Sequence, residues 1–221
     1  MKKEKKGILK DIREMKTGKI QTNNPLWGFP IWQVKTDFDR KFNEDLIEEI
    51  YSIAEQVKQD PNPKDSLWDY YRPQLSILKT ALTSFTNNAV YTNIPEIREL
   101  NYKFKCDMGW VNVREPGQGI ELHAHPDASF ATTYYVKTPY NCGDLVCHVN
   151  GEEVRITPEE GCVVILPFYI LHEIEQNHSH DLRISISTDF TQVVDKGAKD
   201  ALVLKSWCDD MMKVKEWNSV S

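Results

Sequence analysis

The sequence predicts an α+β fold, mainly β, in which helices buttress one side of a jelly-roll β core. Two observations support this prediction. Apolar residues recur at helical spacing in the first half of the chain, and after Lys105 they alternate or form short runs between turn residues. Helices followed by a block of strands are typical of α+β domains. We expect one domain over residues 21–221, with its β core at about 107–190, preceded by a flexible basic arm, residues 1–20.

Most of the predicted helices precede the β core, and one follows it. Residues 43–59 place Leu46, Ile50 and Ile53 on one face, with acidic residues early in the segment, where the helix dipole favours them. Pro and Asp in DPNPKDS predict a loop after this helix. Further helices are expected at about 75–85, from Pro95 to about 104 and, closing the domain, at about 201–217.

Eight short strands are expected between residues 109 and 188. The segments PGQG, TPYNCG, NGEE, TPEEG and QNHSHD supply the turns between them. Strands of this number and spacing are typical of a sandwich or barrel. The expected strands are 109–114, 120–123, 130–136, 144–149, 153–156, 162–166, 172–175 and 182–188.

Composition and charge exclude several classes of protein. With 27 basic against 33 acidic residues and a net charge of −6, the chain lacks the basic surface that nucleic-acid binding requires. No apolar run reaches the roughly 20 residues of a membrane span, and the start has no apolar region of signal-peptide length, so we expect a cytoplasmic protein. An odd number of cysteines without CxxC spacing predicts reduced thiols. They are Cys106, Cys142, Cys147, Cys162 and Cys208.

Three histidines and one aspartate have the spacing of a metal site. His123, His125 and Asp127 alternate in LHAHPD, so in an extended segment their side chains would share one face. His172 follows His125 by 47 residues (172 − 125), about four expected strands later, and a barrel can return it to the same mouth. Non-haem iron sites use two histidines and one carboxylate. We therefore favour His125, Asp127 and His172 as ligands, with His123 and His125 as the alternative near-side pair.

An arginine follows the last of these histidines. Arg183 lies in LRISIS, eleven residues after His172 (183 − 172), and Ser185 shares its face. An arginine near a metal can hold a carboxylate through two parallel hydrogen bonds. This suits 2-oxoglutarate, which would chelate iron through its oxo acid and leave its far carboxylate for a cation. Of Tyr134 and Tyr135, which alternate across a strand, one can face inward and offer its hydroxyl.

These segments resemble a known family. WVNVREPGQGIELHAHPDASFATTYYVKTP, GDLVCHVN, TPEEGCVVILPFYILHEIEQN and LRISIS are similar to the prolyl-hydroxylase-like branch of the Fe(II)/2-oxoglutarate oxygenases, and LWGFPIWQV looks like its opening strand. The resemblance covers most of residues 26–190. It implies a double-stranded β-helix core of the jelly-roll or cupin-like type. It also implies Fe(II), 2-oxoglutarate as cosubstrate, and O2.

The resemblance also implies roles for individual residues. His172 would be the distal iron ligand, Arg183 and Ser185 would bind the far carboxylate of 2-oxoglutarate, and Tyr135 and Asn112 would be further contacts. The chain departs from the pattern in two places. Ala131–Thr132 stands where the family often has a serine-glycine pair. Counted from Pro116–Gly117, the family's spacing makes His123 the first ligand and puts His125 where the acid normally stands.

Three functions follow from these patterns. The first is an oxygenase, most simply a hydroxylase of a peptide or small metabolite that releases succinate and CO2. The second is a cupin-type metal-binding protein or isomerase that uses His123, His125 and His172 without 2-oxoglutarate, because GCVVILPFYILHEIEQ also resembles a cupin motif. The third is a sugar- or protein-binding jelly roll without metal chemistry. Neither a nucleic acid nor a membrane is an expected partner, and the sequence indicates no oligomeric state.

Overall fold

The computed structural model describes residues 20–22, 31–149 and 151–193. Most of the expected basic arm, the expected closing helix at 201–217 and Cys208 lie outside the described residues. No helix in the described part of the chain is long and apolar enough to cross a membrane.

The helices come first, as expected, and their ends have local causes. Helix α2 (Arg40–Gln59) begins earlier than predicted, because the Asp39 side chain accepts a hydrogen bond from the Phe42 backbone N–H at 2.8 Å and caps it. Helix α3 (Pro73–Asn93) begins with proline in its first turn and ends just before Pro95. Helix α4 (Pro95–Glu99) is shorter than expected. A 3-10 helix (Leu67–Asp69) lies between α2 and α3.

All eight expected strands are present, and two more precede them. The short strands match the expected segments to within a residue or two at each end, whereas β3 and β10 extend several residues beyond them. They are β1 (Ile20–Thr22), β2 (Trp32–Lys35), β3 (Lys103–Arg114), β4 (Ile120–His123), β5 (Phe130–Lys137), β6 (Leu145–Val149), β7 (Glu152–Ile156), β8 (Cys162–Pro167), β9 (Leu171–Ile174) and β10 (Arg183–Val193).

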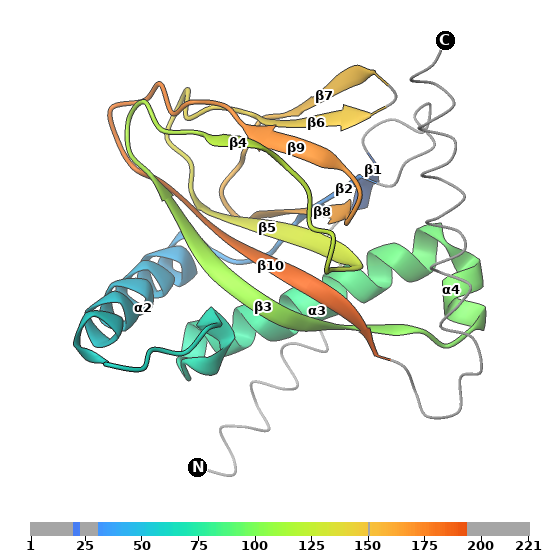
Figure 1. The fold of residues 1–221 in the computed structure, drawn as a ribbon, viewed down its shortest axis with the longest axis horizontal. Helices are drawn as coiled ribbons and strands as arrows, with labels where there is room; N and C mark the ends of the chain where they lie inside the picture. The colour runs from blue at the N-terminus through green and yellow to red at the C-terminus, as the bar shows by residue number, and fades with distance from the viewer. Residues whose placement is uncertain (1–19, 23–30, 150, 194–221) are drawn as a thin grey trace.

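The strands form two antiparallel sheets that face each other (Figure 1). The six-stranded major sheet has the order β1-β2-β8-β5-β10-β3, and the four-stranded minor sheet has the order β4-β9-β6-β7. From β3 onward the chain passes back and forth between the sheets, with β3, β5, β8 and β10 in one and β4, β6, β7 and β9 in the other. This interleaving is the topology of a double-stranded β-helix, and the two sheets stay separate rather than closing into one barrel.

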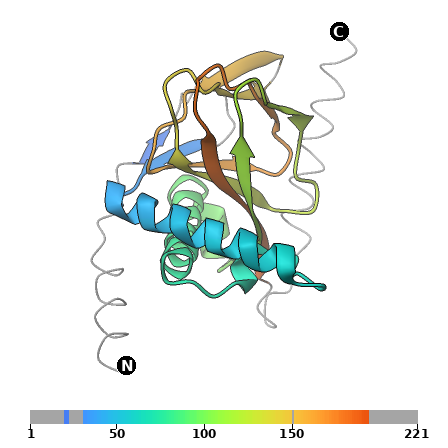
Figure 2. The same cartoon turned by 90° about the vertical axis from the view of Figure 1, so that its left-hand side faces the viewer.

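The major sheet has apolar residues on both faces. Helices α2 and α3 cover its outer face, opposite the minor sheet (Figures 1 and 2). The larger core cluster fills this helix-sheet layer and includes Leu46 of α2, Leu78 of α3 and Ile186 of β10, none of which is exposed. A second cluster, which includes Tyr135 and Cys147, lies between the sheets. The four described cysteines are free and buried, as expected for reduced thiols.

The last strand, β10, divides its residues between these two faces. Ile184, Ile186 and Phe190 belong to the cluster on the helix side. Because successive side chains of a strand point to opposite faces, the odd-numbered residues as far as Asp189 point between the sheets. These are Arg183, Ser185, Ser187 and Asp189. The final strand therefore presents a polar row, with a cation at one end and an acid at the other, to the interior.

Candidate metal and anion-binding site

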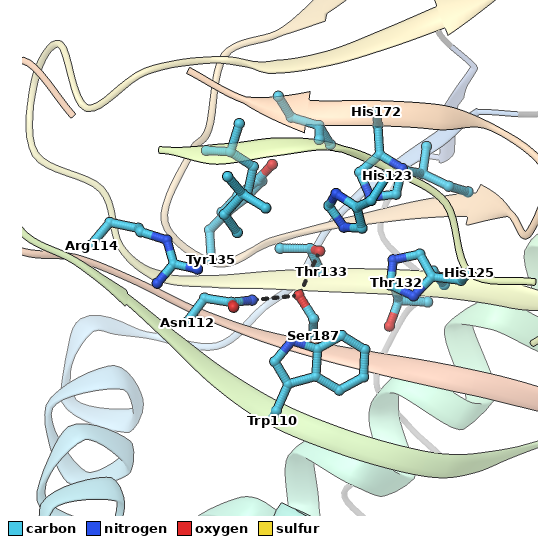
Figure 3. A pocket seen from close by; sticks show the side chains of 15 residues that line it. Trp110, Asn112, Arg114, His123, His125, Thr132, Thr133, Tyr135, His172 and Ser187 are labelled. Carbon is cyan, nitrogen blue, oxygen red and sulfur yellow. Dashed lines mark hydrogen bonds between the residues drawn. The ribbon is translucent and has the colours of Figure 1, made fainter. Parts of the chain in front are cut away.

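A cavity of about 260 Å³ opens between the two sheets (Figure 3). Its wall combines imidazole, hydroxyl, amide and guanidinium groups with apolar side chains. The lining residues are Trp110, Asn112, Arg114, Ile120, His123, His125, Ala131, Thr132, Thr133, Tyr135, Leu145, Leu166, His172, Ile174 and Ser187. A mostly apolar cavity with a few convergent polar groups is the usual form of a small-molecule site.

Three histidines converge at one end of this cavity. His123 of β4 lies directly opposite His172 of β9, so their side chains share a face of the minor sheet, and the ring centroids are 4.3 Å apart. His125 follows β4 in a loop whose backbone is held by a 3.1 Å hydrogen bond from its N–H to the carbonyl of Phe168. One ring nitrogen from each histidine lies within 4.8 Å of those of the other two.

The second nitrogen of each ring already faces an acceptor. Nδ1 of His123 lies 2.8 Å from the carbonyl oxygen of Glu121, and Nδ1 of His172 lies 2.9 Å from that of Ile170. Nδ1 of His125 lies 3.0 Å from a carboxylate oxygen of Asp189. A proton on Nδ1 of His123 and of His172, donated to these carbonyls, would leave the lone pair of each ring on Nε2, where it can bind a metal.

Burial keeps at least one of these rings uncharged. His172 is 6% exposed. Its burial lowers the pKa to about 4, and the neighbouring His123 and His125 act in the same direction. The imidazole is therefore neutral at pH 7 and can donate a lone pair to a cation.

Asp127 does not join this cluster. We expected it to share a face with His125 through extended backbone, but Pro126 and Asp127 form a turn in which the N–H of Ala128 bonds to the carbonyl of His125. The turn breaks the alternation of side chains, and Asp127 is exposed. The histidines that the structure brings together are instead those of the alternative set, His123, His125 and His172.

The other end of the cavity is rich in cations and hydroxyls. Arg183 is 1% exposed and donates from Nη1 to the carbonyl of Gly143 at 3.0 Å. Its guanidinium carbon lies 5.6 Å from the centre of the Tyr135 ring. In the described part of the chain, Nε and Nη2 of Arg183 and the hydroxyl of Tyr135 have no hydrogen-bond partner although they are buried. Unpaired buried donors are costly, so this corner suits an anion that would accept from them.

A second arginine, which the sequence reasoning missed, lines the cavity directly. Arg114 of β3 lies opposite Arg183 of β10 in the strand pairing, so both side chains start from the same face of the major sheet. Nε of Arg114 also has no partner among the described residues. The signal was in the sequence, because Trp110, Asn112 and Arg114 occupy alternate positions of WVNVR and all three line the cavity.

The remaining expected site residues lie between the two ends. Asn112 is buried and donates to the hydroxyl of Ser187 at 2.9 Å, which lies 3.1 Å from that of Thr133 (Figure 3). Ser185 is 1% exposed and pairs with both Asn112 and Tyr135 across its neighbouring strands. These groups form a polar floor that joins the histidines to the arginines.

Solved structures of other proteins are similar to this chain in fold, whereas sequence comparisons find no relative. No family model matches the chain, and no curated protein matches it in sequence. A solved prolyl-4-hydroxylase of Pseudomonas putida is 16% identical, with 84% of this chain and 93% of that chain covered and a TM-score of 0.52. The collagen prolyl hydroxylase of Paramecium bursaria Chlorella virus-1, solved as a 2-oxoglutarate complex, is 15% identical over 74% of this chain and 96% of that chain, with a TM-score of 0.52.

A third similar structure comes from an enzyme of a different kind. The non-haem α-ketoglutarate-dependent carbocyclase SnoK from nogalamycin biosynthesis is 11% identical over 77% of this chain and 84% of that chain, with a TM-score of 0.55. At such low identity the three likenesses concern the fold. They confirm the expected double-stranded β-helix with buttressing helices.

Proposed function

We propose that this chain is an Fe(II)- and 2-oxoglutarate-dependent oxygenase that hydroxylates an unactivated C–H bond of a peptide or small metabolite. One observation carries the proposal. Three histidines with converging ring nitrogens share a cavity with Tyr135, and a buried arginine with unpaired nitrogens lies against the Tyr135 ring. A metal ion and an anionic cosubstrate are the ligands that these two groups would bind. The fold shared with two prolyl hydroxylases supports the proposal.

Each group of side chains would have one task. His123, His125 and His172 would hold the iron, which, when bound with 2-oxoglutarate, supplies the activation of O2 that side chains cannot. Arg183 and Tyr135, with Arg114 beside them, would hold the far carboxylate of the cosubstrate by charge-assisted hydrogen bonds. Asn112 and Ser185 lie between these ends, where they can orient the rest of the molecule.

A cupin-type metal protein that does not use 2-oxoglutarate is the second candidate. The observation that favours it is the ligand cluster itself, which contains three histidines and no carboxylate among the described residues. Arg183 argues the other way, because a metal site alone gives no reason to bury a guanidinium with two nitrogens that have no partner among the described residues.

Anaerobic titration separates the two candidates. Fe(II) and then 2-oxoglutarate are added to the purified protein under argon, and we expect a visible charge-transfer band that requires both, followed by succinate release when O2 is admitted. In Arg183→Gln, metal binding should persist while the dissociation constant for 2-oxoglutarate rises at least about tenfold, because a buried anion contact is lost. Arg155→Gln, an exposed arginine on the outer face of the minor sheet, is the matched control. Metal binding without any effect of 2-oxoglutarate would favour the cupin.

A further inference from the structure

We propose that Asp189 is a positioning residue of the metal site. Its carboxylate would hold His125 as a ligand and supply the negative charge that the three histidines lack. The inference rests on the proposed metal-binding function and concerns a residue outside the ligand cluster. Oδ1 of Asp189 lies within ion-pair distance of Nδ1 of His125, at 3.0 Å, and this buried oxygen has no hydrogen-bond partner in the described part of the chain.

The strand geometry directs Asp189 towards the histidine. It is the last odd-numbered residue of the polar row of β10, so it points between the sheets. The pairing of β10 with β3 is irregular at this point. Thr188 pairs with Gly109 and Phe190 pairs with Cys106, so two residues of β3, Asp107 and Met108, stand opposite Asp189. The extra residue of this bulge belongs to β3. On its other side Asp189 pairs regularly with Ala131 of β5, which lines the cavity, so the inward direction of the row is kept at Asp189.

The surroundings of His125 fix the ring on several sides. The ring of Trp110 stacks on it with centroids 5.8 Å apart and an interplanar angle of 26°, and the ring of His172 stacks on it at 5.2 Å and 12°. The side chains of His125 and Asp189 are 12% and 22% exposed, so their contact is largely shielded from water. A partly buried carboxylate at this nitrogen orients the ring and makes its other nitrogen a stronger ligand.

Charge gives Asp189 a second task. An iron site with two histidines and one carboxylate carries one negative ligand, whereas three neutral imidazoles carry none. Asp127 is exposed and lies outside the cluster. Asp189, in contrast, contacts His125, which belongs to the cluster. Its charge would offset part of the charge of a bound divalent cation across a single imidazole ring.

Metal affinity tests the proposal without relying on turnover. Co(II) binding to the full chain is followed by its visible absorption under competition with a chelator, in Asp189→Asn, Asp189→Ala and Asp189→Glu. We expect Asp189→Ala to bind Co(II) about 10- to 100-fold more weakly than wild type. Asp189→Asn, which keeps an acceptor without the charge, should fall between the two. Asp189→Glu should recover part of the affinity that Asp189→Asn loses.

Two controls keep the result interpretable. Asp127→Asn removes the exposed carboxylate nearest in sequence to His125, and it should leave Co(II) affinity unchanged. Urea unfolding of each metal-free variant should give the wild-type midpoint, because the proposed role appears only when metal is bound. An affinity loss that is accompanied by an equal loss of metal-free stability would assign Asp189 a structural role and overturn the proposal.

The remaining outcomes are equally decisive. Wild-type Co(II) affinity in both Asp189→Asn and Asp189→Ala would overturn the role of Asp189 and leave the proposed function standing. Weaker binding in Asp127→Asn alone would assign the carboxylate role to Asp127. A wild-type chain that binds neither Co(II) nor Fe(II) would remove the proposed function, and this inference with it.

Discussion

The two sheets that face each other across the cavity are supported differently on their outer sides. The major sheet carries α2 and α3, and the larger core cluster fills the layer between them (Figures 1 and 2). The outer face of the minor sheet carries charged side chains instead. Arg155 of β7 forms ion pairs there with Glu153 and Glu175, and His148 lies 3.2 Å from Glu173. Of the two faces of the minor sheet, the inner one contributes side chains to the core between the sheets.

Both sheets contribute residues to the site, and the chemical groups differ between the two sheets. His123 and His172 come from the minor sheet, and the row from Arg183 to Asp189 comes from the major sheet. The candidate anion-binding groups therefore lie on the sheet that helices support, whereas two of the three candidate metal ligands lie on a sheet that no helix of the described residues covers. A metal ion bound to His125 as well would tie the two together, because His125 contacts Asp189 of the major sheet.

The largest expected effect is the loss of a ligand from the minor sheet. In His172→Ala we expect Co(II) and Fe(II) binding to fall by at least about 100-fold, because only two imidazoles remain to hold the metal. Chelator competition measures the affinity. The metal should also raise the unfolding midpoint of wild type, since it binds only the folded state, and this rise should vanish in the variant. Unchanged affinity would mean that His172 is not a ligand.

A substitution on the helix side should affect stability far more than one on the outer face of the minor sheet. Leu78 of α3 is completely buried in the larger core cluster. We expect Leu78→Ala to lower the free energy of unfolding by about 2–5 kcal/mol through lost burial and the cavity left behind. Arg155→Ala, whose side chain is half exposed, should cost no more than about 1 kcal/mol. Urea unfolding measures both, and equal costs would contradict the comparison.

The smallest expected effect is a loss of stability at alkaline pH, caused by a buried cysteine on the inner face of the minor sheet. Burial raises the pKa of Cys147 from 9.0 to about 12. The unfolded chain loses this thiol proton above pH 9 while the folded chain keeps it, so stability is intact below pH 9 and falls as the pH rises further. We expect a loss of about 1 kcal/mol between pH 9 and 10 from this thiol. Urea midpoints under reducing conditions measure it.

Cys147→Ala provides the control for the alkaline effect. This variant should start from a lower stability, because a buried side chain has been removed, and should then lose less of it between pH 9 and 10. Parallel pH profiles in the two proteins would show that Cys147 stays unionised in the unfolded chain or ionises freely in the folded one.

Much of the fold follows from local patterns in the sequence. Strand β4 begins and ends as expected, directly after Gly119, although its pairing with β9 is irregular between Ile120 and His123. Strand β10 was predicted to end at residue 188 but continues to Val193, because its last residues pair with β3 rather than following an apolar pattern of their own. The short strand β1 has no such pattern and was not predicted; its pairing with β2 defines it.

The site was only partly predictable, for a related reason. His172, Arg183 and Tyr135 stand out by their motifs, and the structure brings them to one cavity or against its wall. The turn at Asp127 depends on how Pro126 continues the chain, which spacing alone does not reveal. Asp189 belongs to the same alternation as Arg183, yet its partner His125 is 64 residues away (189 − 125), and only the fold places them together.

The polar row of β10 has a consequence for how any ligand can lie in the cavity. A strand rises by about 3.4 Å per residue, so Arg183 and Asp189 are separated by about 20 Å of rigid backbone with opposite charges at its ends. A molecule with an acid group at one end can be accommodated in one direction and is repelled in the other. The strand would therefore set the direction in which such a ligand lies.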